Sequence, residues 1–340
     1  MLHVVDRLTG GVPAAVASYI RSSDPAFKHV IASPRGEAAQ AWRSLDVRTI
    51  DLGVGHGRRI MTLRRIINET EPSAVHAHSS FAGAYARLAV SRNRHHIVYT
   101  PHCFSFMRED LNKVAKAGYF AIEWLLSFNT SVLLACSATE QKVAASLPGT
   151  RARTSFAPNL SELATLPASP TYREDLVVGM VGRVSIQKDP DHFVRALEAI
   201  RESGIAVKGV WIGDGESEQR DKLINAGVEV TGWLAPDAVS EKLSELDIYL
   251  HSAAWEGFPI ALLDAHQAGL PSLYRRSRSL SELPDDLSFD RQLAHLVVAR
   301  NDAESWVRWS LDNHQKWSEV FTAHSRAEQR DALRRAWKPI

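Results

Sequence analysis

Residues 248–264 read IYLHSAAWEGFPIALLD, and this stretch decides the fold. It begins with the apolar residue types of a buried strand and ends in an apolar segment of helical character. Pro259 suits the first turn of that helix, and Gly269 suits the position just past its end. Glu256 therefore stands at the carboxyl end of a strand, which is where open α/β sheets bind ligands.

Two acids, Glu256 and Asp264, bracket the expected start of this helix. The free N–H groups and the positive dipole end of a helix N-terminus favour an anion such as phosphate. Carboxylates accept hydrogen bonds from sugar hydroxyls. Acids beside a phosphate site therefore indicate a pocket for a nucleotide sugar.

The same strand-then-helix pattern repeats along the whole chain, which predicts an α/β fold of parallel sheets with helices on both faces. The expected strands are residues 3–5, 29–33, 49–52, 74–78, 96–100, 132–136, 154–157, 176–181, 207–212, 228–231, 248–251, 272–274 and 296–298. The pattern stops at residues 166–171, LPASPT, where two prolines occur. We therefore expect two doubly wound domains, 1–165 and 175–310, joined by a linker at 166–174 and followed by a helical segment at 311–340.

Bulk composition excludes several classes of protein. The chain has 340 residues, a net charge of +1 and only two cysteines, Cys103 and Cys136. It therefore lacks the basic character of a nucleic-acid-binding protein and the cysteine pattern of a disulfide framework. Its first residues form a strand pattern, and no apolar run is long enough to span a bilayer, so we expect a cytoplasmic protein.

Three glycine-containing loops follow expected strands. Gly10 and Gly11 lie in LTGGVP at 8–13, where glycine lets the backbone approach a ligand closely. A full G-x-G-x-x-G fingerprint is absent, which disfavours a two-domain dehydrogenase. The alternative for this loop is a purely structural turn.

The second glycine loop, at 182–189, carries two cations. It contains Gly182, Arg183 and Lys188, and both cations suit phosphate oxygens. The alternative is a pair of solvated surface charges. The third loop, WIGDGE at 211–216, holds Gly213 and Gly215, which would leave room for a base or a ribose or would simply form a tight turn.

Histidines occur at strand ends in the first half of the chain, at His76, His78 and His102. His76 and His78 share one strand face, which is compatible with a zinc pair. No third ligand has suggestive spacing, so we favour a polar cleft wall and predict no metal. His102 is expected to face the cleft between the domains.

Residues 107–128 mix basic and apolar side chains in a helical region. Arg108, Lys113 and Lys116 alternate there with aromatic and leucine residues. Such a segment either packs against the sheet or rests on an anionic membrane surface. Both alternatives stay open.

Taken in order, these elements resemble the retaining GT-B-fold glycosyltransferases of the group 1 family (family 4). The resemblance rests on eight landmarks: the Gly10-Gly11 loop, HAHSSFAG at 76–83, YTPH at 99–102, APN at 157–159, Gly182-Arg183 with Lys188, GDG at 213–215, TGW at 231–233 and EGFP at 256–259. Two features depart from the family pattern. Asp264 stands where the E-x7-E motif has its second glutamate, and the loop at 272–279 has three arginines but no glycine pair.

The resemblance implies two Rossmann-like domains facing a central cleft, with the C-terminal helix returning to the first domain. It implies transfer of a sugar from a nucleotide diphosphate, with UDP favoured, and retention of the anomeric configuration. It also implies catalytic roles for Glu256, His102, Lys188 and Arg183. The donor-binding residues that it implies are Gly10, Gly11, Gly182, Arg183, Lys188, Gly213, Gly215, Glu256, Gly257, Phe258, Pro259, Ile260 and Asp264.

The implied partners are a nucleotide-sugar donor and a glycan or lipid-linked acceptor in cell-surface polysaccharide assembly, with no cofactor and no nucleic acid. Peripheral contact with the inner face of the membrane is a further expectation. Two alternatives remain. One is a nucleotide-sugar epimerase on the same fold, and the other is a non-catalytic subunit that binds a nucleotide sugar.

Overall fold

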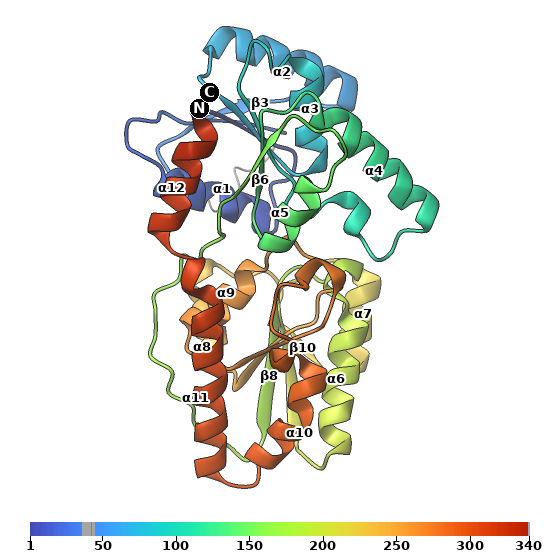
Figure 1. The fold of residues 1–340 in the computed structure, drawn as a ribbon. Helices are drawn as coiled ribbons and strands as arrows, with labels where there is room; N and C mark the ends of the chain where they lie inside the picture. The colour runs from blue at the N-terminus through green and yellow to red at the C-terminus, as the bar shows by residue number, and fades with distance from the viewer. Residues whose placement is uncertain (36–41, 43–44, 339–340) are drawn as a thin grey trace. The chain divides into compact units, whose positions relative to one another are not determined.

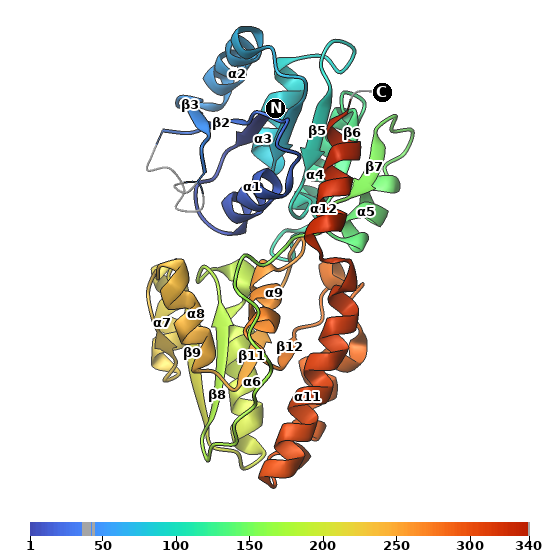
Figure 2. The same ribbon diagram turned by 90° about the vertical axis from the view of Figure 1, so that its left-hand side faces the viewer.

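The computed structural model describes residues 1–35, 42 and 45–338. The chain divides into two compact units: Met1–Leu160 together with Ala323–Ile340, and Ser161–Thr322. Figure 1 and Figure 2 show that each unit is a parallel sheet with helices on both faces. The two units are described separately below.

Unit 1 is built on a seven-stranded parallel sheet in the order β3-β2-β1-β4-β5-β6-β7. Its strands are β1 (Leu2–Val5), β2 (Val30–Ser33), β3 (Arg48–Asp51), β4 (Val75–His78), β5 (Ile97–Thr100), β6 (Val132–Ala135) and β7 (Arg153–Phe156). Its helices are α1 (Gly11–Ser22), α2 (His56–Thr70), α3 (Ser80–Ala89), α4 (Lys113–Ser127), α5 (Ala138–Ala145) and α12 (Arg326–Trp337). The central strands are buried along their whole length, as expected where helices cover both faces of a sheet.

Unit 2 is built on a five-stranded parallel sheet in the order β10-β9-β8-β11-β12. Its strands are β8 (Leu176–Val181), β9 (Val207–Ile212), β10 (Glu229–Val230), β11 (Ile248–His251) and β12 (Ser272–Tyr274). Its helices are α6 (Pro190–Glu202), α7 (Ser217–Asn225), α8 (Pro236–Ser244), α9 (Ile260–Gln267), α10 (Phe289–Ala299) and α11 (Ala303–Val320).

Strand order places a topological switch point in each sheet. In unit 1 the chain leaves β1 toward β2 on one side, and β4 pairs with β1 on the other. In unit 2 the corresponding pair is β8 and β11. Loops that leave neighbouring strands in opposite directions open a crevice at the carboxyl ends of those strands, and ligands of open α/β sheets bind there.

The first twelve expected strands agree with the structure to within one residue at each end. The expected strand at 296–298 is wrong, because those residues lie inside α10. The buried residues of α10, Phe289, Gln292, Leu296 and Ala299, recur with helical spacing, while Val298 is 64% exposed. The short valine run thus lies at the edge of the buried face of α10.

The last two helices belong to different units. Helix α11 lies in unit 2, and α12 packs against α1 in unit 1, as Figure 1 shows. Ser18 on α1 donates a 3.2 Å hydrogen bond to Oε1 of Gln329 on α12, and Leu333 and Trp337 join a core cluster with Met1 and Tyr19. Among the described residues, no helix combines the length and apolar character needed to cross a membrane.

Candidate active site

The switch point of unit 2 brings together two residues that the sequence marks separately. Lys188 ends the loop that follows β8, and Glu256 lies in the loop that follows β11. Nζ of Lys188 donates a hydrogen bond to Oε1 of Glu256, and both side chains are largely buried, with 16% and 14% exposed. A paired cation and carboxylate therefore occupy the crevice where this fold binds ligands.

The two loops are fixed to each other by further hydrogen bonds. Ser252 Oγ donates to the Lys188 carbonyl at 2.6 Å, and Gln187 Nε2 donates to the Trp255 carbonyl at 3.0 Å. The Glu256 amide donates to Ser279 Oγ at 2.9 Å. These bonds hold Lys188 and Glu256 in place before any ligand binds, and such preorganisation favours electrostatic stabilisation of developing charge.

The glycines of the β8 and β9 loops are explained by close approach. A Cβ on Gly182 would lie 3.0 Å from Cε of Lys188, so glycine leaves room for the lysine stem. A Cβ on Gly213 would lie 2.2 Å from the Gly182 carbonyl oxygen, and one on Gly215 would lie 2.0 Å from that of Val184. The glycines are therefore required because the backbones of the loops after β8 and β9 pack closely against each other, next to Lys188.

The arginines near the carboxyl ends of the unit 2 strands differ in whether they form ion pairs. Arg275 forms a 2.5 Å ion pair with Asp189, which also caps the N-terminus of α6, and Arg276 pairs with Asp285 at 2.7 Å. For Arg183, the structure gives no ion pair with any described residue. The arginines at 275 and 276 are thus partly neutralised, whereas Arg183 keeps an unpaired guanidinium beside the Lys188 loop.

The EGFP segment leads into the start of α9. Gly257, Phe258 and Pro259 are buried, Pro259 is the N-cap residue, and Ile260 opens the helix. Pro259 offers no side-chain cap, and its carbonyl accepts only the Leu262 amide at 3.2 Å, so the amides of Ile260 and Ala261 have no acceptor on that residue. The expected placement of a helix N-terminus directly after Glu256 is found.

Asp264 lies in the middle of α9, and among the described residues no hydrogen bond joins it to Lys188 or Glu256. Burial raises the pKa of Asp264 to about 7, the neighbouring Glu162 carboxylate adds to the rise, and a hydrogen bond with Ser161 opposes it. A carboxyl group with this pKa is partly protonated near neutrality, so it can both donate and accept hydrogen bonds.

Asp264 gives a prediction about stability. Its folded-state pKa lies above the unfolded value of about 3.9, so the folded chain binds more protons, and stability falls as pH rises from about 4 to about 7. The Asp264→Asn variant cannot ionise. We expect the stability of Asp264→Asn relative to the parent to rise by roughly 2–3 kcal/mol between pH 5 and pH 8, because the parent loses stability through this group over that range.

Thermal unfolding of both proteins at the two pH values measures this difference. Asp221→Asn, on the exposed face of α7, serves as the control and should leave stability unchanged at both. A stability difference that stays the same or reverses between pH 5 and pH 8 would show that folding does not raise the pKa of Asp264.

Unit 1 presents a second set of candidate residues at its own switch point. Gly10 follows β1 with a positive φ of 85°, and Gly11 opens α1. Across the switch, Ser79 Oγ donates a hydrogen bond to Oδ1 of Asp6. This pair connects the loop after β4 to the loop after β1, and no sequence pattern singled out Asp6.

His102 lies in a strained turn after β5. It has a φ of 51°, Cys103 has a φ of 86°, and Ser79 after β4 has a φ of 71°. Positive φ values are costly for residues other than glycine and cluster at functional sites. Buried Glu140 holds this turn by accepting the Cys103 amide at 2.7 Å and the Cys136 amide at 2.9 Å. The Ser137-x-x-Glu140 capping pattern was the signal in the sequence that could have identified it.

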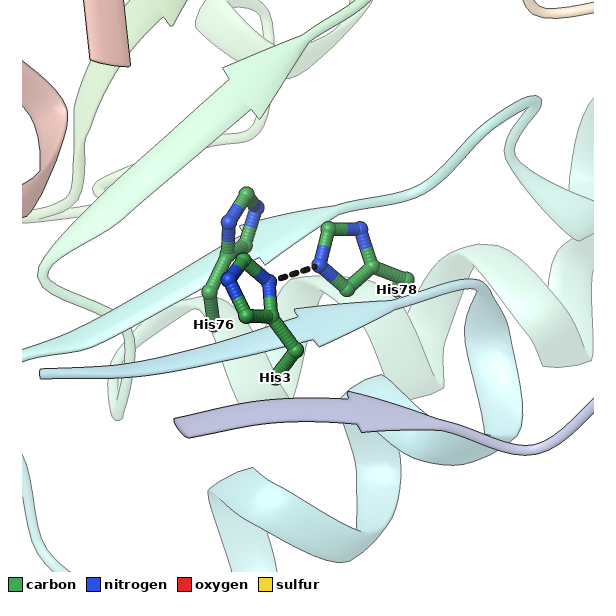
Figure 3. Close-up of side chains that lie close together, drawn as sticks. All are labelled: His3, His76 and His78. Carbon is green, nitrogen blue, oxygen red and sulfur yellow. Dashed lines mark hydrogen bonds between the residues drawn. The ribbon is translucent and has the colours of Figure 1, made fainter. Parts of the chain in front are cut away.

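His76 and His78 are joined by a third histidine that the sequence interpretation missed. Figure 3 shows His3 on β1 beside them, with Nδ1 of His3 and Nε2 of His78 sharing a 3.1 Å hydrogen bond. One nitrogen from each ring lies within 4.8 Å of the others, a spacing that a metal ion would suit. The strand register, in which His3 pairs with His76, creates this cluster.

The nitrogens of this cluster already have hydrogen-bond partners. Trp337 Nε1 donates to Nδ1 of His76 at 3.1 Å, and Nε2 of that ring bonds Thr100 Oγ1 at 2.8 Å. His3 bonds His29 with its other nitrogen at 3.0 Å. A metal ion would have to displace these bonds, so the geometry favours a hydrogen-bonded cluster over a metal site.

Comparison with known proteins matches both halves of the chain. Residues 5–159 match the family model of the glycosyl transferase 4-like domain, and residues 175–309 match that of the glycosyl transferases group 1. Residues 175–309 contain the Lys188–Glu256 pair, and residues 5–159 contain His102.

Two curated proteins are similar at the sequence level. An uncharacterised 41.2 kDa protein in the cps region of Klebsiella pneumoniae is 25% identical, with 98% of this chain and 93% of that protein covered. The Escherichia coli UDP-Gal:alpha-D-GlcNAc-diphosphoundecaprenol alpha-1,3-galactosyltransferase is 25% identical, with 74% of this chain and 68% of that protein covered.

The fold agrees with a solved structure. The crystal structure of HepE from Anabaena, in complex with UDP and glucose, is similar with a TM-score of 0.67 over 95% of this chain and 99% of that chain. At 14% identity this likeness shows the fold alone, which is GT-B with two Rossmann-like domains. With both family models matched along the sequence, the chain belongs to the group 1 family of glycosyltransferases.

Proposed function

We propose that the chain transfers a sugar from a nucleotide diphosphate, with UDP as the favoured nucleotide, to a glycan or lipid-linked acceptor in cell-surface polysaccharide assembly. The observation that carries the proposal is the Lys188–Glu256 pair at the switch point of unit 2. A buried cation at this edge suits a diphosphate, and a carboxylate beside it suits sugar hydroxyls.

In the proposed reaction, the bond between the anomeric carbon and the donor phosphate oxygen breaks, and the acceptor hydroxyl oxygen bonds to that carbon. Negative charge develops on the leaving diphosphate, which Lys188, Arg183 and the N–H groups at the start of α9 stabilise. The leaving phosphate takes the acceptor proton, which accounts for front-face attack and retained configuration. With the charge stabilised in this way, we propose that no metal ion is needed.

The other candidate residues have supporting roles in this proposal. Glu256 accepts hydrogen bonds from the donor sugar hydroxyls while it orients Lys188. Asp264 binds the ribose hydroxyls, a role that its pKa of about 7 supports because the neutral acid also donates. The Gly11 amide and His102 act from unit 1, on the phosphate or sugar and on the acceptor.

Named relatives support the choice of donor and acceptor. The similar E. coli enzyme is named for a UDP-linked galactose and a diphosphoundecaprenol acceptor, and HepE was crystallised with UDP and glucose. The similar Klebsiella protein lies in a cps region. These names favour a UDP-sugar donor and a lipid-linked acceptor for this chain too.

A thermal-shift screen of nucleotide sugars tests the donor, because a ligand that binds only the folded state raises the melting temperature. We expect UDP-sugars to raise it more than GDP- or ADP-sugars. The stabilising donor is then incubated with lipid-linked acceptors, and the product is analysed by NMR. Transfer with retained configuration supports the proposal. An epimerised sugar from donor alone, or binding without transfer to any acceptor, would overturn it.

Helix α4 supports a further proposal, that unit 1 contacts an anionic membrane surface from the cytoplasmic side. The helix exposes a continuous apolar stripe in which Val114 is 82%, Ile122 51% and Leu125 60% exposed. Lys113 is exposed and Lys116 is partly exposed on the same helix. An exposed apolar face next to cations is the pattern of a helix that lies in a membrane interface.

Vesicle binding tests this surface. We expect Val114→Glu and Leu125→Glu each to weaken binding to phosphatidylglycerol-containing vesicles by about tenfold or more, since each removes a large apolar side chain from the interface. Met61→Glu is the matched control, because Met61 on α2 is 67% exposed in the same unit. Equal binding by all three variants would contradict the proposed surface.

A further inference from the structure

Four imidazole rings in unit 1 form one continuous chain of hydrogen bonds. Ser23 Oγ lies 2.8 Å from Nε2 of His29, whose Nδ1 lies 3.0 Å from Nε2 of His3. Nδ1 of His3 lies 3.1 Å from Nε2 of His78, and Nδ1 of His78 lies 3.2 Å from Nε2 of His102. Every link joins one ring nitrogen to one neighbour.

This chain of hydrogen bonds connects Ser23, near the surface, to His102, the candidate acceptor-side residue. It crosses adjacent strands of the sheet, from the start of β2 through β1 and β4 to the turn after β5. His3 and His78 are fully buried, whereas Ser23 and His29 at the outer end are partly exposed. Nδ1 of His102, at the inner end, has no hydrogen-bond partner within the part of the chain that the structure describes.

All four rings are expected to be neutral at pH 7. Burial lowers the pKa of His3 and His78 well below the ordinary value, and it lowers the pKa of His29 and His102 to about 4. A neutral imidazole has one donor and one acceptor nitrogen. The four hydrogen-bonded rings therefore have only two consistent tautomeric states. Either every ring carries its proton on Nε2, or every ring carries it on Nδ1.

Ser23 selects between these two states. Its hydroxyl donates to the Ile20 carbonyl at 2.8 Å, which commits its only proton. The oxygen must then accept from Nε2–H of His29. Each following ring takes the same tautomer, and the last ring, His102, is left with an unprotonated Nδ1.

His76 lies beside this chain without being part of it. Its Nδ1 accepts from Trp337, which can only donate, and its Nε2 bonds Thr100. Its tautomer is therefore set separately.

We propose that Ser23, His29, His3 and His78 are positioning residues that hold His102 with its proton on Nε2 and its lone pair on Nδ1. In the proposed function, on which this last step rests, that lone pair accepts a hydrogen bond from a substrate hydroxyl. The tautomer itself does not depend on any substrate, so it can be tested independently of sugar transfer.

The test is ¹⁵N NMR of the histidine side chains in the full chain at pH 7.5, without donor or acceptor. The His102 signals are assigned by their loss in His102→Gln. We expect the parent protein to show protonated Nε2 and unprotonated Nδ1 at His102. In Ser23→Ala and His29→Phe, the ratio of this tautomer to the other should fall about fivefold, which is the effect of losing one hydrogen bond of ordinary net strength.

His96→Phe is the matched control, because His96 is partly buried in the same unit and bonds the Ala336 carbonyl outside the chain of rings. It should leave the His102 tautomer unchanged. Protonated Nδ1 in the parent, or the same ratio in Ser23→Ala and His29→Phe as in the parent, would overturn the proposal. So would one equivalent of tightly bound zinc that is lost in His3→Phe, since the metal would occupy nitrogens that the chain uses. Failure of sugar transfer alone would leave this result standing.

Discussion

Replacement of Lys188 by methionine is expected to lower the rate of sugar transfer by at least about 100-fold, the usual effect of removing one preorganised group that stabilises transition-state charge. Methionine keeps most of the stem that packs against Gly182 but removes the ammonium. It also leaves the Glu256 carboxylate without its partner in a largely buried position. The loss should fall mainly on kcat, because charge on the diphosphate grows in the transition state.

Two further variants make this result specific. Glu256→Gln keeps the size of the side chain but weakens both the orientation of Lys188 and the bonds to sugar hydroxyls, so it should also lower transfer strongly. Lys222→Met is the matched control, because Lys222 pairs with Asp191 at 3.0 Å on the exposed surface of unit 2. Turnover of Lys188→Met close to that of the Lys222→Met control would contradict the role given to this lysine.

The second large effect concerns stability and is expected for Glu123→Leu, which should destabilise unit 1 by about 3–5 kcal/mol. Glu123 on α4 accepts a 2.9 Å hydrogen bond from Nη2 of Arg87 on α3, and both side chains are almost fully buried. It also accepts from the Tyr99 hydroxyl at 2.9 Å. Removing the carboxylate leaves a buried guanidinium without its counter-charge.

This prediction is measured by hydrogen exchange at β5, which reports on unit 1 alone, together with calorimetric melting. Glu69→Leu is the control, since Glu69 pairs with Arg65 on the exposed face of α2 in the same unit and such pairs contribute about 0–1 kcal/mol. The double variant Arg87→Met with Glu123→Leu should recover much of the lost stability, because no buried charge then remains unpaired. Equal destabilisation by Glu123→Leu and Glu69→Leu would show that the buried pair has no special effect.

Local sequence patterns were sufficient for most of the fold. Short β-branched runs between helical patterns located β1–β12, because strands buried on both faces carry continuous apolar residues. The error at 296–298 came from a valine run too short to distinguish a strand from part of a helix. The periodicity of Phe289, Gln292, Leu296 and Ala299 was the better indicator, and it requires a longer window.

The candidate site was only partly predictable. Lys188 and Glu256 could each be selected from their loops, but their pairing depends on β8 and β11 being neighbours. Strand order is a tertiary property that no local pattern encodes. For the same reason His3 and His29 were missed, since they join His78 only through the pairing of β1 with β2 and β4. Glu123 lies in the segment predicted as a helical region of basic and apolar side chains, and its burial was not predicted.

Calorimetric titration of UDP into the protein tests most directly the central claim that Lys188 and Glu256 form the donor site. The account predicts one binding site per chain in the parent protein and in Lys222→Met, with binding at least about tenfold weaker in Lys188→Met, since a charge-assisted bond to a phosphate contributes about 1.5–3 kcal/mol. The same affinity for UDP in the parent and in Lys188→Met would contradict it.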